Sequence, residues 1–253
     1  MIYDLQKASM WKRISAFLFD GILLGIVAVL IAWLLSLALG YDGHRERLEE
    51  RYAYYGQEFD IDLHLSLNEY EALDEAGLSR LNAAYDALSK DQDAVRAYAM
   101  VIQLTILITT FAILLAYLSM EFFIPLRLGH GRTLGKKIFG LALMQTDGVK
   151  IRSVTLFIRT FLGKFTIETM IPVIIILMIY WGTIGIVGPI VLLLILLVEA
   201  GVLIGTRTNA LIHDLLANTV VVDYASQMIF DTREDMIRFK EQAAAEAAAR
   251  QDY

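Results

Sequence analysis

Residues 14–39 read ISAFLFDGILLGIVAVLIAWLLSLAL, an apolar run in which Asp20 is the one charged residue. At about 1.5 Å of rise per residue, an α-helix of this length exceeds the roughly 30 Å hydrocarbon core of a bilayer. Lys7, Lys12 and Arg13 precede the run, as in a secretory signal. The apolar region is too long for such a signal and contains an acid, so we expect a retained membrane-spanning helix.

Three more apolar runs follow in a chain of 253 residues that is 57% hydrophobic, with a mean hydropathy of +0.55. These values exceed those of an average water-soluble domain. The junction between the last two runs contains glycines and a proline and no charged residue, which favours a tight hairpin there. The predicted fold is an all-α polytopic membrane protein with an extracytoplasmic helical insertion and four transmembrane helices, at residues 14–39, 98–126, 154–181 and 186–206.

The distribution of charge predicts the orientation of these helices, because Lys and Arg in short flanks resist translocation. The link at residues 127–153 holds six basic residues and one acidic residue, whereas the insertion at residues 41–97 holds six basic and fourteen acidic residues. We therefore expect a multi-pass protein of the cell (inner) membrane with the link and both termini cytoplasmic. Residues 1–222 form the membrane domain, and residues 223–253 form a charged helical tail.

The insertion is long enough for a small helical cap. Ser66 followed by Glu69 is a capping-box pattern, Gly77 suits a helix end, and Ser79 can start a further helix. The acidity of the insertion is typical of a solvated surface, which is the favoured interpretation. The alternative is an acidic funnel that concentrates cations at a pore mouth.

The link contains the glycine- and lysine-rich stretch at residues 129–137, but its spacing does not match a phosphate-binding loop, and Lys137 stands where Ser or Thr would be needed. Residues 133–144 interleave apolar side chains with Lys136 and Lys137 instead. This pattern predicts a basic amphipathic helix on the anionic inner leaflet. Asp147 and Gly148 then predict a turn.

Carboxylates inside the predicted spans are unusual, because each costs about 2.5–3.5 kcal/mol to place at the membrane centre. Asp20, Glu121 and Glu199 lie six to eight residues from a flanking arginine, which places them roughly 9–12 Å from the cytoplasmic edge. Glu168 falls at roughly 13 Å on the same scale. The four form a candidate transport or ion-binding belt.

Two cations, Arg159 and Lys164, lie at a similar depth, so four acids leave a charge of −2 for protons or a bound cation to neutralise. The alternative, with about equal support, is that the same groups form structural ion pairs that fix helix register. Lys164 and Glu168 are four residues apart and could pair on one helical face. Convergence of the acids on one cavity would favour transport, and separate pairing would favour structure.

Several function classes have no support in the sequence. There is no cysteine, His213 has no second histidine at ligand spacing, and we find no nucleophile–base pair or cofactor motif. We therefore expect a protein that is not an enzyme, binds no metal or cofactor, and does not bind nucleic acid.

Two ordered segments carry a family resemblance. Residues 131–141 read GRTLGKKIFGL and residues 210–222 read ALIHDLLANTVVV. Together with Arg13 and Asp20 in the first span and Arg159 in the third, they resemble the signature of the RDD family of membrane proteins. Asp214 takes the place of the second signature aspartate. The insertion is longer than the usual connection of the family, and Glu168 stands where we would expect Asp.

This resemblance implies a bacterial membrane protein of a family in which some members are linked to sodium/proton exchange. On that basis Asp20 and Glu199 would alternate between a proton and a cation, with Glu121 completing the site. Arg13, Arg159 and Asp214 would stabilise or gate its inner mouth.

A non-transporting membrane scaffold or accessory subunit is the alternative function. Its docking surfaces would be the insertion and a tail helix at residues 232–250 that exposes Met236, Ile237 and Phe239. The expected partners are the lipid bilayer, a small cation or proton, and further copies of the chain. The patterns Gly21-x-x-x-Gly25 and Gly201-x-x-x-Gly205 offer flat surfaces for such a homo-oligomer.

Overall fold

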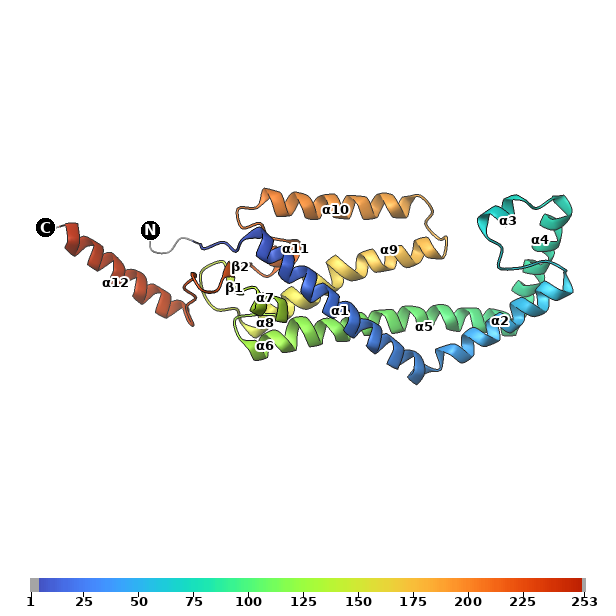
Figure 1. The fold of residues 1–253 in the computed structure, drawn as a ribbon, viewed down its shortest axis with the longest axis horizontal. Coiled ribbons are helices and arrows are strands. Elements are labelled where there is room, and N and C mark those ends of the chain that lie inside the picture. Colours follow the sequence, from blue (N-terminus) through green and yellow to red (C-terminus); the bar gives the residue numbers. More distant parts are fainter. Residues whose placement is uncertain (1–4, 252–253) are drawn as a thin grey trace. The chain divides into compact units, whose positions relative to one another are not determined.

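The computed structural model describes the backbone of residues 5–251 and the side chains of residues 5–246. The chain forms two compact units. One comprises Met1–Ala28 together with Ile113–Tyr253, and the other is Val29–Ala112. We call them the core unit and the insertion unit. Figure 1 shows the order of the elements along the chain.

Four helical segments are long and apolar enough to cross a membrane, as the sequence predicts, with ends that differ from the predicted ones by a few residues. Two of the segments are single α-helices, and each of the other two contains a stretch of π-helix. The segments are α1 (Met10–Leu39), α5 to α6 (Gln92–Tyr117, η1 Leu118–Phe123, Ile124–Leu128), α8 to α9 (Ser153–Ile158, η2 Arg159–Met170, Ile171–Tyr180) and α10 (Val187–Gly205).

The insertion unit contains three further helices, α2 (Tyr41–Glu58), α3 (Leu67–Glu71) and α4 (Glu75–Lys90). The predicted capping box at Ser66 is present and starts α3. The prediction of a helix end at Gly77 is wrong, because Asp74 caps α4 and accepts a hydrogen bond from the Gly77 nitrogen at 2.7 Å. Gly77 and Ser79 therefore lie inside α4.

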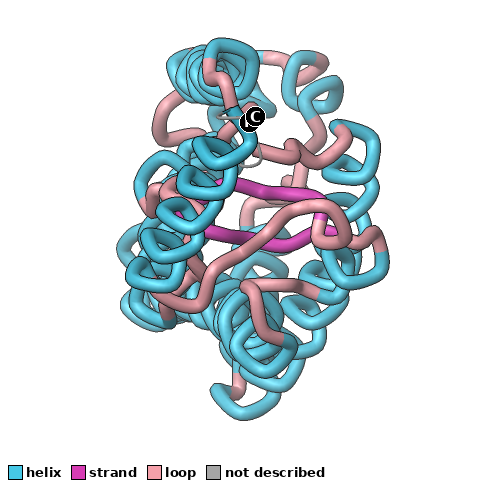
Figure 2. The backbone as a smooth tube through the Cα atoms, turned by 90° about the vertical axis from the view of Figure 1, so that its left-hand side faces the viewer, coloured by secondary structure: helices cyan, strands magenta, loops and turns pink. Residues whose placement is uncertain are grey.

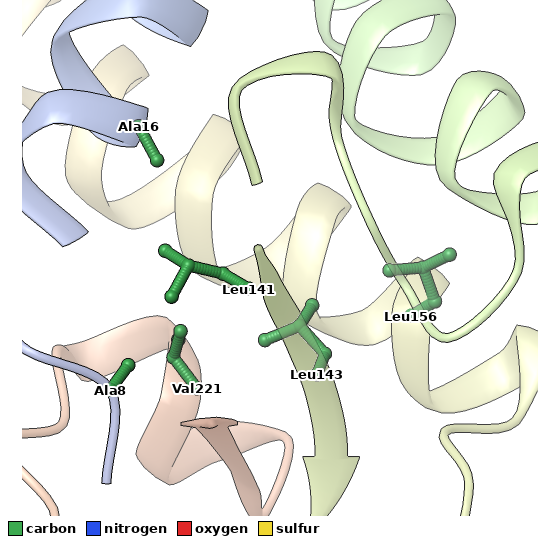
Figure 3. Packing of buried hydrophobic residues seen from close by; sticks show 6 residues of the cluster. All are labelled: Ala8, Ala16, Leu141, Leu143, Leu156 and Val221. Carbon is green, nitrogen blue, oxygen red and sulfur yellow. The ribbon is translucent and has the colours of Figure 1, made fainter. Parts of the chain in front are cut away.

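The core unit contains a two-stranded antiparallel sheet (Figure 2). This sheet was not predicted from the sequence. Strand β1 (Leu141–Gln145) pairs with β2 (Thr219–Asp223), with Leu143 opposite Val221. One face of the sheet packs against buried residues of the N-terminal segment, α1 and α8, which Figure 3 shows from close by. The opposite face buries Met144, Val220 and Val222. Both strands are nearly continuous apolar runs because both of their faces are covered.

The basic helix predicted for residues 133–144 is much shorter. Helix α7 (Leu134–Ile138) ends before Gly140, whose φ of +67° suits glycine, and the next residues enter β1. Lys137 is exposed, but Lys136 is buried. The local pattern was misleading because the pairing of β1 with β2 joins segments far apart in sequence.

After α10 the chain forms the short helix α11 (Ile212–Leu216) and, beyond β2, the tail helix α12 (Arg233–Gln251). The predicted tail helix is present. Its Met236 is 7% exposed rather than free for a partner, and its sulfur would lie 3.7 Å from a Cβ added at Gly148. The Phe239 ring packs against that of Phe230, while Ile237 is exposed.

Helix α7 lies directly against α1 because residue 135 is glycine. The Gly135 nitrogen donates a hydrogen bond to Asp20 Oδ1 at 2.8 Å. A Cβ at this position would lie 2.5 Å from the Ala16 carbonyl oxygen and 2.9 Å from the Asp20 carboxylate. A side chain therefore cannot be accommodated without moving one of the two helices.

We expect Gly135→Ala to lower the free energy of unfolding by about 1–3 kcal/mol, the usual cost of overpacking. The matched control is Gly43→Ala in α2, because a Cβ at Gly43 meets nothing within 4 Å. That variant should be neutral or slightly more stable. Denaturant titration of the purified protein in micelles measures both, and equal stability of the two variants would contradict the close approach of α7 and α1.

Candidate functional site

The charged residues in the interior of the second and third spans lie on π-helical turns. Glu121 lies in η1, and Arg159, Lys164 and Glu168 lie in η2. In an α-helix, residues five apart such as Arg159 and Lys164 would be about 140° apart around the axis. In a π-helix, with its i→i+5 hydrogen bonds, they lie almost above one another. The π-helical geometry therefore gathers these charges on one side.

A proline follows each of these carboxylates by four residues, at Pro125 and Pro172. Proline has no N–H, so the carbonyl of the residue four positions earlier loses its α-helical partner. In η1 the freed carbonyl is that of Glu121, and it accepts a hydrogen bond from Thr160 Oγ1 at 3.0 Å. The proline thus makes a backbone group available that joins the second span to the third.

Arg159 and Asp214 form a fully buried ion pair. Arg159 Nε donates to Asp214 Oδ1 at 3.0 Å, and each side chain is 2% exposed. Thr219 Oγ1 donates to the same oxygen at 2.9 Å. Burial alone would raise the pKa of Asp214, but the Arg159 guanidinium, followed by His213, holds that pKa well below its ordinary value. Asp214 is therefore ionised.

Arg13 joins α1 to this pair. Its Nη2 lies 4.0 Å from Asp214 Oδ2, and its guanidinium donates to the carbonyls of Thr208 and Asn209 at 3.2 and 2.7 Å. The predicted role of Arg13 in stabilising or gating the inner mouth of a site stays a prediction. The two signature residues Arg13 and Asp214 are thus brought together.

Glu121 and Lys164 form a second buried pair, with 2.6 Å between Lys164 Nζ and Glu121 Oε1. Lys136 and Arg159 are close enough to add to the positive field at Glu121. Burial lowers the pKa of Lys136 to about 8. Among the described residues, Glu121 Oε2 and Arg159 Nη1 are buried without a hydrogen-bond partner.

Asp20 is held by α7 rather than by a cation. Its Oδ2 accepts from Thr133 Oγ1 at 2.5 Å, and its Oδ1 accepts from the Gly135 nitrogen. Thr133 also caps α7. Asp20 therefore fixes the link against α1, with Lys136 near enough to interact with its charge.

His213 lies between two carboxylates. Its Nδ1 is 2.6 Å from Glu168 Oε2, its backbone nitrogen donates to Glu168 Oε1 at 2.8 Å, and its Nε2 is 3.5 Å from Asp214 Oδ2. Gly163 permits this approach, because a Cβ there would lie 2.4 Å from that of His213. Glu168 therefore pairs with His213 rather than with Lys164, which the four-residue spacing had suggested.

Glu199 differs from the other four acids. It is half-buried on α10 and, within the part of the chain that the structure describes, has no hydrogen-bond or ion-pair partner. It is near enough to Glu168 for the two carboxylates to repel each other. Glu199 is the free carboxylate beside a paired one.

We call the buried and half-buried charged side chains around Arg159 the charge network. Its four carboxylates balance its four cations when His213 is neutral. The carboxylates are Asp20, Glu121, Glu168 and Asp214, and the cations are Arg13, Lys136, Arg159 and Lys164. The predicted belt, with its charge of −2, is a different set, because it included Glu199 and did not include Asp214, Arg13 or Lys136.

Three contributors were missed as site residues from the sequence: Thr133, Lys136 and His213. The sequence could have indicated each of them. Thr133 and Lys136 belong to the segment at residues 131–141 that carries the family resemblance, and His213 directly precedes Asp214. Among residues 5–251, no three His, Asp or Glu side chains are grouped so as to hold a metal ion.

The profile of the RDD family matches residues 7–218. The chain belongs to the RDD family. All members of the charge network lie within the matched region, so this RDD protein folds its signature residues into one buried cluster. No curated protein and no solved structure matches the chain.

Removing one partner of a buried pair should test the charge network. Lys164→Met leaves Glu121 without its closest cation, which we expect to cost about 3–5 kcal/mol of unfolding free energy. The loss should fall at the low end because Lys136 and Arg159 remain nearby. In the double variant Glu121→Gln/Lys164→Met, most of the stability should return. Simple additivity of the single effects in a double-mutant cycle would argue against the pair.

The stability of the RDD protein should also depend on the proton of His213. Burial, followed by Arg159, lowers the pKa of folded His213 from its ordinary value of 6.5, against the opposing effect of Asp214 and Glu168. The unfolded chain then binds this proton first, so the free energy of unfolding falls as the pH drops from about 6.5 toward the folded pKa. His213→Gln should flatten that slope.

The control for this pH dependence is His44→Gln in α2, outside the charge network. It should keep the parental slope when unfolding is followed between neutral and mildly acidic pH. Equal slopes for the parent and His213→Gln would show that His213 does not change its proton affinity on folding.

Proposed function

We propose that this RDD protein exchanges protons for a small monovalent cation, with His213, Glu168 and Glu199 as the exchanging groups. The observation that carries the proposal is the position of Glu199, a half-buried carboxylate beside Glu168 that has no hydrogen-bond or ion-pair partner among the described residues. When Glu199 is ionised, five carboxylates face four cations, which leaves a charge of −1 while His213 is neutral. One proton or one monovalent cation neutralises that charge, and no catalytic group or cofactor is needed.

His213 supplies the proton side of this exchange. A neutral imidazole has one donor and one acceptor nitrogen. If Nδ1–H donates to Glu168, then Nε2 faces Asp214 Oδ2 at 3.5 Å as a second acceptor. A proton on Nε2 converts this contact into an attractive one and makes His213 a cation beside Glu168. Because burial lowers the pKa of folded His213 below its ordinary value of 6.5, this protonation takes place at mildly acidic pH.

Glu168 and Glu199 supply the cation side. While His213 is protonated, its charge compensates Glu168, and the pair attracts no further cation. Once His213 loses the proton, the two neighbouring carboxylates hold an excess of negative charge that a monovalent cation can offset. A proton on His213 and a bound cation thus compensate the same negative charge, and this competition is the requirement for one-for-one exchange. Asp20, assigned an exchanging role from the family resemblance, serves here to hold α7.

We further propose that the protein lies in the cell membrane with both termini cytoplasmic, on the basis of the basic link. The bilayer is then one partner, and a second copy of the chain is another. Added Cβ atoms at Gly21, Gly25, Gly201 and Gly205 meet nothing within 4 Å, so neither glycine surface is used inside the chain. Close helix packing between two copies could use either one.

One observation favours the alternative of a non-transporting scaffold. Glu121, Glu168 and Asp214 each have a basic partner of their own, as expected of groups that fix helix register. Under this alternative the neutral charge network is purely structural, and Glu199 has no role in binding.

The two functions can be separated in proteoliposomes that carry a pH-sensitive dye. We expect the parent to dissipate a pH gradient when sodium or potassium is added, and Glu199→Gln and Glu168→Gln to lose at least tenfold in rate. Glu71→Gln, an exposed carboxylate of α3, is the matched control and should keep the parental rate. His213→Gln should remove the dependence of the rate on pH below about 6.5, the range in which folded His213 takes up its proton. If the parent behaves like empty liposomes with every monovalent cation, exchange is wrong and the scaffold function stands.

A further inference from the structure

A hollow of about 240 Å³ lies within the insertion unit, between α2, α4 and the first turns of α5. Its apolar floor includes the buried Leu48, Leu88 and Ala94. Ligand pockets for drug-sized molecules are on the order of 300–1,000 Å³. This hollow is therefore sized for a smaller ligand.

Three tyrosines, one from each helix, line the hollow: Tyr52, Tyr85 and Tyr98. Tyr85 is fixed in place, because its hydroxyl donates to the Leu63 carbonyl at 3.0 Å. Burial, followed by the closeness of Tyr85 and Tyr98, raises the pKa of Tyr52 above its ordinary value. The three phenol rings therefore line the same hollow, one from each helix.

The surroundings of this aromatic cluster are negative. Residues 41–97 contain fourteen acidic and six basic residues, a net charge of −8. Glu49 is the carboxylate that acts on Tyr52, and His64 Nε2 lies 3.0 Å from Glu49 Oε2. The His64 ring is 5.1 Å from that of Tyr52. A ligand in the hollow would thus meet aromatic faces with a negative field around them.

We propose that this hollow binds a small organic cation of the methylated ammonium class. Aromatic faces attract a cation through the ring quadrupole, and tyrosine clusters suit quaternary ammonium groups whose surface is apolar but whose charge is positive. A bare metal ion would need oxygen ligands, which the apolar floor does not provide. A neutral apolar molecule would gain nothing from the negative surroundings.

The first test compares two probes on the unmodified full-length protein in nanodiscs made of phosphatidylglycerol and phosphatidylethanolamine, which lack choline. Choline and its neutral isostere 3,3-dimethylbutan-1-ol have nearly the same shape. Titration calorimetry should show choline binding about tenfold more tightly, as expected for a cation–π contribution of about 1.4 kcal/mol. Equal affinities would identify a merely apolar pocket, and no binding of choline would also overturn the proposal.

Variants then locate the site. Tyr52→Leu and Tyr98→Leu should each weaken choline binding about tenfold, whereas Tyr52→Phe, which keeps the aromatic face, should bind within about threefold of the parent. Tyr54→Leu is the matched control, because Tyr54 is an exposed tyrosine of the same helix that does not line the hollow. If Tyr54→Leu weakens binding as much as Tyr52→Leu, or Tyr52→Phe loses binding, the site does not lie on this tyrosine cluster.

Discussion

The ion pair between Arg159 and Asp214 is the interaction on which the rest of the core unit depends. A buried guanidinium stays charged, so it requires a carboxylate partner of equal burial. Asp214 meets that need only if α11 is held against η2, which Gly163 allows by leaving room for His213. Two further contacts of Asp214, with Thr219 and Arg13, then connect β2 and α1 to the same point. One desolvated pair thus determines where four elements meet.

The π-helical segments explain how two apolar spans can present charged groups to that point. Pro125 frees a carbonyl at Glu121, and the widened turn aligns residues of η2 that an α-helix would direct to different sides. The cost of these irregular turns is offset by contacts within the protein, since Thr160 satisfies the freed carbonyl. Irregular backbone at membrane depth is tolerated where protein groups satisfy it.

The features of this protein that could be predicted from the sequence are local ones. The spans could be located because apolar length is a local property, and the capping box at Ser66 because its two hydrogen bonds join residues three apart. Sheet pairing and the partners of the acids could not be located, since they depend on segments that meet only after folding. The four-residue spacing predicted a contact between Glu168 and Lys164. In the structure Lys164 pairs with Glu121, and Glu168 pairs with His213 of α11. Lys136 resembled a surface lysine until Asp20 and Glu121 were placed around it.

The paired groups of the charge network limit where its net charge can change. Groups paired at contact distance, such as Arg159 with Asp214 and Lys164 with Glu121, compensate each other's charge inside the protein. They act as a fixed frame. A change of one unit of charge falls instead on groups outside this frame, such as Lys136, whose pKa burial lowers to about 8, His213, with one ring nitrogen facing Asp214 at 3.5 Å, and Glu199, which has no hydrogen-bond or ion-pair partner among the described residues. Because His213 and Glu199 both adjoin Glu168, a change of charge at either one alters the field at the same carboxylate. Under the proposed exchange, this shared neighbour couples the proton to the cation.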